Sequence, residues 1–452
     1  MSRPVTSLKI DTSVKSIILL TLPISMAKLI PELNYLFNAA FLGHLGSKEL
    51  ALAGITGVYY LVFASIGYGL NNALLSLMSR KAGEENRNAI FVNLWHGVLL
   101  GWILASVFSI VTWTSIKPIM SWAGIEGDSV IMAGDYLHIR IIGLFFLYTL
   151  QMQNSFLITI QKTRYLIVIA IVQSVANIAL DYGMIFGHLG FPALGFNGAA
   201  YASVISEFIG MVTVMLVIFS LKITRNYRIR ANFSISYRRI AMVFKVGYPL
   251  MLQLALGTAS WWVFFILVSR NYTNEEQAVS QAMRNLFGLG GVFSWAFGSS
   301  TNTILSNLIG QKRHEEIFVV IRKLLIVSLS GMGVLTILLN IFPGLFFGLF
   351  GQPDHFVTAG TGTLRVVSLA MLFTSVGVIW LNGIIATGHT KIVLATEALG
   401  ITVYLLFVWI TIEVMQYPLE IGWMCEWAYW LVMIIPSYLY LKYGNWRKDI
   451  TY

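Results

Sequence analysis

The side chains most able to do chemistry in this sequence are acids that lie within long apolar stretches. An ionisable group among apolar residues is costly to keep, so it is a candidate for binding an ion or a proton or for pairing with a base. The sequence has no glycine-rich phosphate loop and no nucleophile constellation, its seven histidines are scattered, and its one cysteine lies in an apolar segment. This pattern argues against an enzyme and against a Cys/His metal centre. The acids are Glu32, Asp181, Glu207, Glu397, Glu413 and Glu426.

Asp181 has the most suitable neighbours of these acids. Asn177 lies four residues before it, on the same face of a helix, and we expect the amides of Asn38 and Asn154 to converge on the same carboxylate. One carboxylate with neutral amide oxygens suits a sodium ion, because hard cations prefer oxygen ligands. In that case the ion would bind Asp181, Asn177 and Asn38, whereas in a proton-coupled protein the carboxyl group would carry the proton. The structural alternative is that Asp181 only hydrogen-bonds neighbouring helices.

Glu32 is a second candidate for the titrating group. It lies four residues after Lys28 and beside Pro31, a spacing that also fits a neutralised pair that lowers the cost of inserting the helix in lipid. Glu397 and Glu413 lie nearer the ends of their apolar stretches, and we interpret both as structural or interfacial.

Two ion pairs are predicted from the positions of the remaining acids and bases. Arg140 and Glu207 fall at similar depth in the fourth and sixth apolar stretches, and Arg365 and Glu426 fall early in the tenth and twelfth. Pairing offsets much of the cost of a charge in lipid. We therefore expect Arg140–Glu207 and Arg365–Glu426 to brace the helices, with Arg284 as a competing partner for Glu426.

The elements that carry these residues are predicted to be membrane-spanning helices. The chain has 452 residues, of which 57% are hydrophobic and 11% charged, whereas soluble domains contain about 25% charged residues. A bilayer core takes about 20 apolar residues per helix, and stretches of this kind recur twelve times. They lie at 15–41, 50–78, 90–116, 131–159, 164–187, 196–221, 241–269, 277–307, 319–350, 361–386, 392–415 and 419–441.

The distribution of lysine and arginine predicts the orientation of these helices. With both termini in the cytoplasm, 23 of the 30 basic residues fall in cytoplasmic segments and three in the opposite loops. Positive residues stay on the cytoplasmic side, which accounts for the net charge of +10 without a nucleic-acid partner. We expect the lipid bilayer and a small organic substrate to be the partners of a monomer.

The longest basic segment divides the chain into two related halves. We expect a first six-helix bundle at 1–221, a cytoplasmic linker at 222–240 and a second bundle at 241–452. "SRKAGEENRNAI" follows the second stretch and "SNLIGQKRHEEI" the eighth, at an offset near 227 residues. Six spans per half make the repeats parallel, an arrangement that places a substrate cavity between halves and suits alternating access.

At several of these motifs the sequence resembles the multidrug and toxic compound extrusion (MATE) family, and most closely its bacterial members. The motifs are "FLGHLGSKELALAG", "SRKAGE", "NIALDY", "PALGFNGAAYAS" and "SNLIGQ". The resemblance implies an all-α protein of the bacterial inner membrane, whose two pseudo-symmetric bundles form a V-shaped cavity. It also implies export of organic, often cationic, compounds against an inward flow of protons or sodium. The "N-x-x-x-D" of the fifth span is intact as Asn177 and Asp181.

Three positions depart from the family pattern, so the coupling chemistry does not carry over whole. Asn38 stands where members usually have an aspartate, and Gly257 and Ser375 stand where some have a glutamate and an aspartate. We expect Gly257 and Ser375 to line the substrate cavity together with Trp261 and Trp262. Adjacent aromatic residues, Trp261 and Trp262, could hold an organic cation, although such residues more often face lipid. The alternative function is a flippase for lipid-linked oligosaccharides or lipids. We expect no cofactor apart from Na⁺ as a possible coupling ion.

Overall fold

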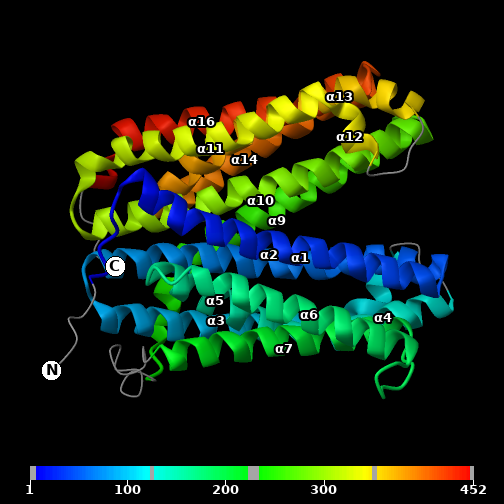
Figure 1. The fold of residues 1–452 in the computed structure, drawn as a ribbon, viewed down its shortest axis with the longest axis horizontal. Coiled ribbons are helices and arrows are strands. Elements are labelled where there is room, and N and C mark those ends of the chain that lie inside the picture. Colours follow the sequence, from blue (N-terminus) through cyan, green and yellow to red (C-terminus); the bar gives the residue numbers. More distant parts are fainter. Residues whose placement is uncertain (1–6, 123–126, 222–233, 349–353, 448–452) are drawn as a thin grey trace. The chain divides into compact units, whose positions relative to one another are not determined.

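The part of the chain that the computed structural model describes, residues 7–122, 127–221, 234–348 and 354–447, is built from helices (Figure 1). The first half contains α1 (Val14–Leu45), α2 (Ser47–Gly83), α3 (Arg87–Trp122), α4 (Asp128–Arg140), α5 (Gly143–Thr159), α6 (Arg164–Phe186) and α7 (Phe196–Ser220). The second half contains α9 (Tyr237–Asn271), α10 (Asn274–Gly310), α11 (Ile317–Ile341), α12 (Pro343–Gly348), α13 (Asp354–Thr387), α14 (Thr390–Val408), α15 (Leu419–Trp423) and α16 (Cys425–Tyr443). Short helical turns lie at His314–Glu316, Trp409–Val414 and Asn445–Arg447. The all-α prediction is confirmed.

The helices agree with the predicted spans. Within the described residues, nine helices are long and apolar enough to cross a membrane, and α4 and α5 together make a tenth span that is bent by 41°. α10 and α16 bring the number to the predicted twelve. α10 is less apolar because its polar run from Ser299 to Thr303 is buried inside the protein. Polar side chains in the interior lower the hydropathy of a span without meeting lipid.

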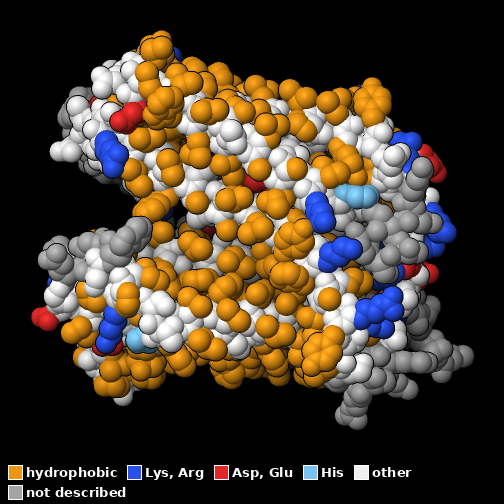
Figure 2. Space-filling model, turned by 180° about the vertical axis from the view of Figure 1, so that it is seen from behind, with side chains coloured by type: hydrophobic (Ala, Val, Ile, Leu, Met, Phe, Trp, Pro, Cys, Tyr) orange, Lys and Arg blue, Asp and Glu red, His pale blue; other side chains and the backbone are white. Residues whose placement is uncertain are grey.

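The surfaces of the helices explain why a chain with so few charges is stable. Figure 2 shows hydrophobic side chains over the flanks, with most charged side chains nearer the helix ends. Leu19, Val175 and Leu216 are each more than 60% exposed. Exposed apolar surface of this extent marks a surface made for a membrane. The structure thus supports a multi-pass membrane protein.

The packing of the two halves supports the predicted duplication. α2 and α10 each contain 37 residues. In the first half, the hydroxyl groups of Ser79 and Thr159 lie 3.3 Å apart. At the equivalent place in the second half, the hydroxyl of Ser306 donates to the carbonyl oxygen of Ala386 at 3.4 Å. Both contacts join the second and fourth spans of their half, and an offset of 227 residues relates them.

The chain divides into two compact units, and the first helix of each half contributes to both. Unit 1 consists of Met1–Leu8 and Met26–Met251, and unit 2 of Lys9–Ser25 and Leu252–Tyr452. Thr21 of α1 donates to the hydroxyl of Ser300 in unit 2 at 2.8 Å. In unit 1, a Cβ added at Gly69 of α2 would lie 2.5 Å from the carbonyl oxygen of Leu250 in α9. Backbone contact this close requires glycine at position 69.

These boundaries differ from the predicted division into 1–221 and 241–452. The first part of α1 belongs to unit 2, although the rest of its half forms unit 1. The first part of α9 belongs to unit 1, although the rest of its half forms unit 2. Sequence periodicity shows where a helix runs but not which neighbours it contacts. The predicted linker at 222–240 is also shorter, since α9 begins at Tyr237; residues 222–233 lie outside the described residues.

Candidate functional site

Two side-chain hydrogen bonds join α1 and α6 at Asp181. The amide of Asn38 donates to Asp181 Oδ2 at 3.4 Å, and the amide of Asn34 donates to Asn177 Oδ1 at 2.5 Å. Residues four apart lie on the same face of a helix, so Asn34 and Asn38 face Asn177 and Asp181 as two successive rungs. Asp181 is 0% exposed and Asn177 is 6% exposed. The rungs therefore form a polar cluster in the interior of unit 1.

This cluster has hydrogen-bonding capacity that the described protein groups do not use. Asp181 Oδ1, Asn177 Nδ2 and Asn34 Oδ1 are buried and have no partner. A buried polar atom without a partner is costly, and such groups inside a membrane mark ion and proton pathways. The free oxygens of Asp181 and Asn34 are the atom type that a hard cation prefers, and the carboxyl group can also hold a proton. The cluster therefore fits a coupling site for either ion.

The structure brings together part of the predicted set. Asn177 and Asn38 meet Asp181 as expected, but Asn154 does not. It lies on α5, which packs mainly against α2, α3 and α7, and within the described residues its Oδ1 has no hydrogen-bond partner. Asn34 was missed, although the spacing of Asn34 and Asn38 repeats the four-residue spacing of the fifth-span motif.

Glu32 is not part of the cluster. Its side chain is exposed on α1, and it forms no ion pair with Lys28 within the described residues, contrary to the expected neutralised pair. Electrostatic interactions do link Glu32 to Lys28 and to Tyr68 of α2. An exposed acid beside a base lacks the buried polar side chains that lie around Asp181, so Glu32 is the weaker candidate.

A second charged cluster in unit 1 pairs Arg140 with Glu207. The guanidinium donates to both carboxylate oxygens, at 2.7 and 2.9 Å, and Tyr60 donates to Glu207 Oε1 at 3.2 Å. The Arg140 guanidinium also lies 3.6 Å from the centre of the Tyr60 ring. A Cβ at Gly143 would collide with this pair. The first predicted ion pair is therefore present, beside the bend between α4 and α5. Both carboxylate oxygens of Glu207 accept a hydrogen bond from Arg140.

The second predicted pair, Arg365–Glu426, does not form, and Arg284 does not replace it. Within the described residues, Glu426 has no ion pair, and its Oε1 has no hydrogen-bond partner. Arg365 is exposed, whereas Val367, two positions on, is 0% exposed. Two residues rotate a helix by about 200°, so Arg365 points away from the interior. Arg284 instead lies 5.7 Å from the centre of the Phe265 ring.

Glu397, which the sequence predicts to be structural or interfacial, is not interfacial. It is 1% exposed in the interior of unit 2. Gln253 donates to its Oε2 at 3.1 Å and Tyr429 to its Oε1 at 2.8 Å. Position near the start of an apolar stretch does not reveal this burial, because it does not show which face of the helix points into the bundle. Glu413, by contrast, is exposed and accepts from Asn271 at 2.8 Å, as expected for an interfacial acid.

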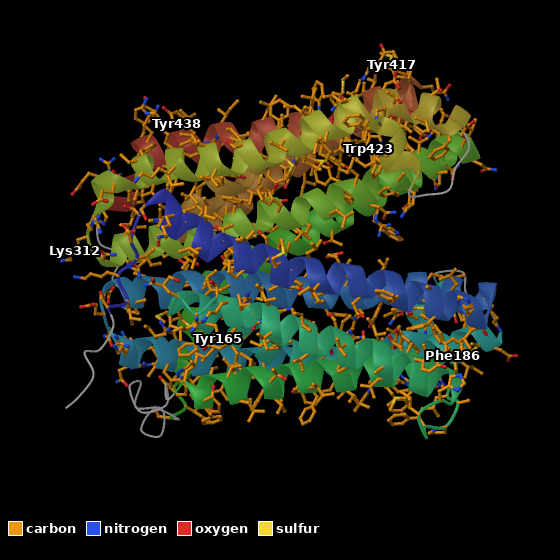
Figure 3. All side chains as sticks on the ribbon, viewed as in Figure 1. Tyr165, Phe186, Lys312, Tyr417, Trp423 and Tyr438 are labelled. Carbon is orange, nitrogen blue, oxygen red and sulfur yellow. The ribbon has the colours of Figure 1, made fainter. Side chains whose placement is uncertain are left out.

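The four predicted substrate-cavity residues lie in different environments. Trp261 packs on Trp423, whose buried side chain is labelled in Figure 3, with ring centres 6.2 Å apart, whereas Trp262 is 61% exposed. Gly257 faces Glu397. Ser375 is 0% exposed, and its hydroxyl lies 2.9 Å from that of Ser294, so it belongs to the contact between α10 and α13 and does not line a surface.

A comparison with family models finds one match in each half of the chain. The MatE model matches residues 23–183 and again residues 249–410. The "Probable multidrug resistance protein NorM" of Thermotoga maritima is 22% identical over 440 residues, which cover 96% of this chain and 93% of that protein. A protein of the same name from Rhizobium meliloti is 30% identical over 171 residues, covering 37% and 35%.

Solved structures share the fold. An outward-facing multidrug resistance MATE family transporter of the MOP superfamily has a TM-score of 0.86 at 19% identity and covers 96% of both chains. A MOP superfamily transporter from Pyrococcus furiosus, described as having a binding pocket of reverse polarity, has a TM-score of 0.84 at 18% identity and covers 97% of this chain and 96% of that chain. Since the family model matches most of both halves, this chain belongs to the MatE family and is a multi-pass membrane transporter, not an enzyme.

Proposed function

We propose that the chain is a secondary active antiporter that exports organic compounds in exchange for protons or sodium by alternating access. The observation that carries this proposal is the buried carboxylate of Asp181, whose Oδ1 has no hydrogen-bond partner within a membrane-spanning helix. A carboxylate in this position can bind an ion that arrives from one side of the membrane and release it to the other side. That exchange is the step that couples an ion gradient to transport.

The two hydrogen bonds between α1 and α6 give ion binding a way to change the contact between these helices. An ionised Asp181 attracts the amide of Asn38, which lies 3.4 Å away. A proton on Asp181 removes that attraction, because the carboxylate charge is then neutralised, and a sodium ion replaces it with contacts to the amide oxygen of Asn38. The contact between the two helices therefore changes when the ion is bound. An element whose two states bind the ion differently is what a coupled conformational change requires.

Cationic or amphipathic organic compounds are the proposed substrates. The chain is rich in aromatic residues, at 13%, and aromatic faces attract organic cations. Among the described residues, the buried charged side chains are acids, namely Asp181, Glu207, Glu397 and Glu426, which favours a cationic over an anionic substrate. The names of the relatives in Thermotoga and Rhizobium, which refer to multidrug resistance, agree with a broad substrate range. We place the protein as a monomer in a bacterial inner membrane with both termini in the cytoplasm.

Transport in proteoliposomes tests the proposal and identifies the coupling ion. The purified protein is reconstituted, and a pH gradient and a sodium gradient are imposed separately while a panel of cationic dyes is followed. We expect one of the two gradients to drive dye movement against its concentration gradient. Dye movement that neither gradient accelerates would contradict antiport. Movement of a lipid-linked oligosaccharide in place of the dyes would support the flippase alternative.

A further inference from the structure

Unit 2 contains a buried carboxylate that the proposed coupling site in unit 1 does not use. Glu397 of α14 accepts from Gln253 of α9 and from Tyr429 of α16. A Cβ at Gly257 of α9 would lie 3.4 Å from Glu397 Oε1, so the small residue leaves room for the carboxylate. Three helices therefore meet at an acid whose partners are neutral donors. No base within the described residues pairs with it.

A second carboxylate, Glu426, lies on the same side of α16 as Tyr429, which follows it by three residues. Glu426 is 2% exposed, and its Oε1 has no hydrogen-bond partner. Tyr429 interacts electrostatically with both Glu397 and Glu426. One tyrosine thus connects two buried acids that come from different helices.

The other groups that face Glu426 are uncharged. Tyr404 of α14 and the neighbouring Cys425 interact with it electrostatically, and the indoles of Trp261 and Trp430 lie near it. The indole nitrogen of Trp430 is buried and also lacks a hydrogen-bond partner. Phenol, thiol and indole groups do not neutralise a carboxylate. Among the residues that the structure describes, Glu426 therefore has no cation to balance a negative charge.

These surroundings favour a proton over a metal ion. A sodium ion needs several oxygen ligands, whereas indole and thiol groups surround Glu426. Within the described residues, no group of three His, Cys, Asp or Glu side chains could hold a metal. A buried carboxyl group with no cation beside it retains its proton, because removal from water disfavours the charged form.

We propose that Glu397, Tyr429 and Glu426 form a proton-binding site in unit 2, with the proton on the carboxyl group of Glu426 and with Tyr429 interacting with both acids. On release, the O–H bond of Glu426 breaks, the proton passes to water, and the electron pair stays on the carboxylate. The role of this site as a second carrier of coupling protons, besides Asp181, rests on the proposed antiport. The binding of the proton itself does not.

Infrared difference spectroscopy of the full chain in lipid vesicles tests proton binding directly. The pH is stepped, and the carbonyl band of protonated carboxylic acids is followed. The exposed acid Glu413 provides the matched control variant. We expect Glu426→Gln to remove one titrating carboxyl from the band, Glu397→Gln to shift the pH at which the band of Glu426 titrates, and Glu413→Gln to change neither.

The outcomes separate the proton site from the antiport. A titrating band of unchanged intensity in Glu426→Gln would overturn the site. If Glu426→Gln does not fold, the folded Tyr429→Phe variant decides, since loss of the phenol must shift the titration of the Glu426 band and an unshifted band rejects the cluster. Loss of the band from Glu426 in a protein whose transport ignores the pH gradient would support the site and reject proton antiport.

Discussion

Four buried acids among the described residues differ in the groups that surround their carboxylates. Glu207 is neutralised by an arginine, Glu397 is held by two neutral donors, Asp181 faces amides and keeps one free oxygen, and Glu426 has no hydrogen bond to its Oε1. A charge that is fully bonded is suited to bracing the fold. An acid with a free oxygen can bind and release an ion. The partners of each acid, more than its depth, distinguish structure from function.

The ion pair Arg140–Glu207 should be structural. Replacing either residue with glutamine leaves the other charge buried and should destabilise the protein by about 3–5 kcal/mol, because both side chains are less than 15% exposed. The charge-swapped double variant should recover part of that loss. Thermal unfolding in detergent measures the effect. Arg140→Lys should rescue poorly, since lysine lacks the planar fork that bonds both oxygens; full rescue would contradict the bidentate geometry.

Asn38→Asp should change how transport depends on pH. The new carboxylate would lie beside Asp181, where Asn38 now donates at 3.4 Å, and two acids at this distance hold a proton to higher pH than one acid does. We expect the pH profile of dye export to move upward. Asn154→Asp is the control, because Asn154 does not bond with Asp181, and its profile should not move. Equal profiles for wild type and Asn38→Asp would show that position 38 does not face Asp181.

The helices that position Asp181 pack closely, and small residues make this possible. α6 and α7 lie against each other (Figure 1), and a Cβ added at Gly198 of α7 would lie 2.5 Å from the carbonyl oxygen of Met184 in α6. Met184 follows Asp181 by three residues. Since backbone cannot move aside as a flexible side chain can, Gly198 fixes the position of the helix that carries the coupling acid.

Gly198→Ala should therefore destabilise the protein and impair transport. Overpacking of this kind costs about 1–3 kcal/mol, and the displaced α6 would lengthen the contact of Asp181 with Asn38. Gly333→Ala in α11 is the matched control, because no atom lies within 4 Å of a Cβ at that position; it should be neutral or slightly stabilising. Thermal unfolding of both variants checks this. Equal stabilities would show that α6 and α7 are not in close backbone contact.

At the scale of the molecule, the duplication did not preserve the chemistry of the two halves. The first and fifth spans of each half are joined by polar side chains, through Asn38 and Asp181 in the first half and through Gln253 and Glu397 in the second. These bonds do not fall at equivalent positions of the repeat. The two halves therefore share the order and packing of their helices, while Asp181 and Glu397 lie at different positions along the equivalent helices.

Sequence reasoning predicted the framework better than the site. Spans and the repeat follow from apolar stretch length and a constant offset, which are local properties. Pairing needs the rotation of each helix about its axis: Arg365 lies two residues from a buried position and so faces outward, and Asn154 has the right chemistry on a helix that faces elsewhere. The sequence left Glu397 either structural or interfacial, because distance along the sequence from a helix end does not measure depth in the bundle.

The central claim, that Asp181 couples an ion gradient to export, is tested most directly by uphill transport in proteoliposomes. Asp181→Asn preserves size and polarity but cannot carry the negative charge that binds a proton or sodium ion. We predict that this variant folds, still exchanges dye across the membrane when dye is present on both sides, and loses nearly all gradient-driven export, while the control Glu413→Gln behaves as wild type. Wild-type uphill export by folded Asp181→Asn would contradict the account.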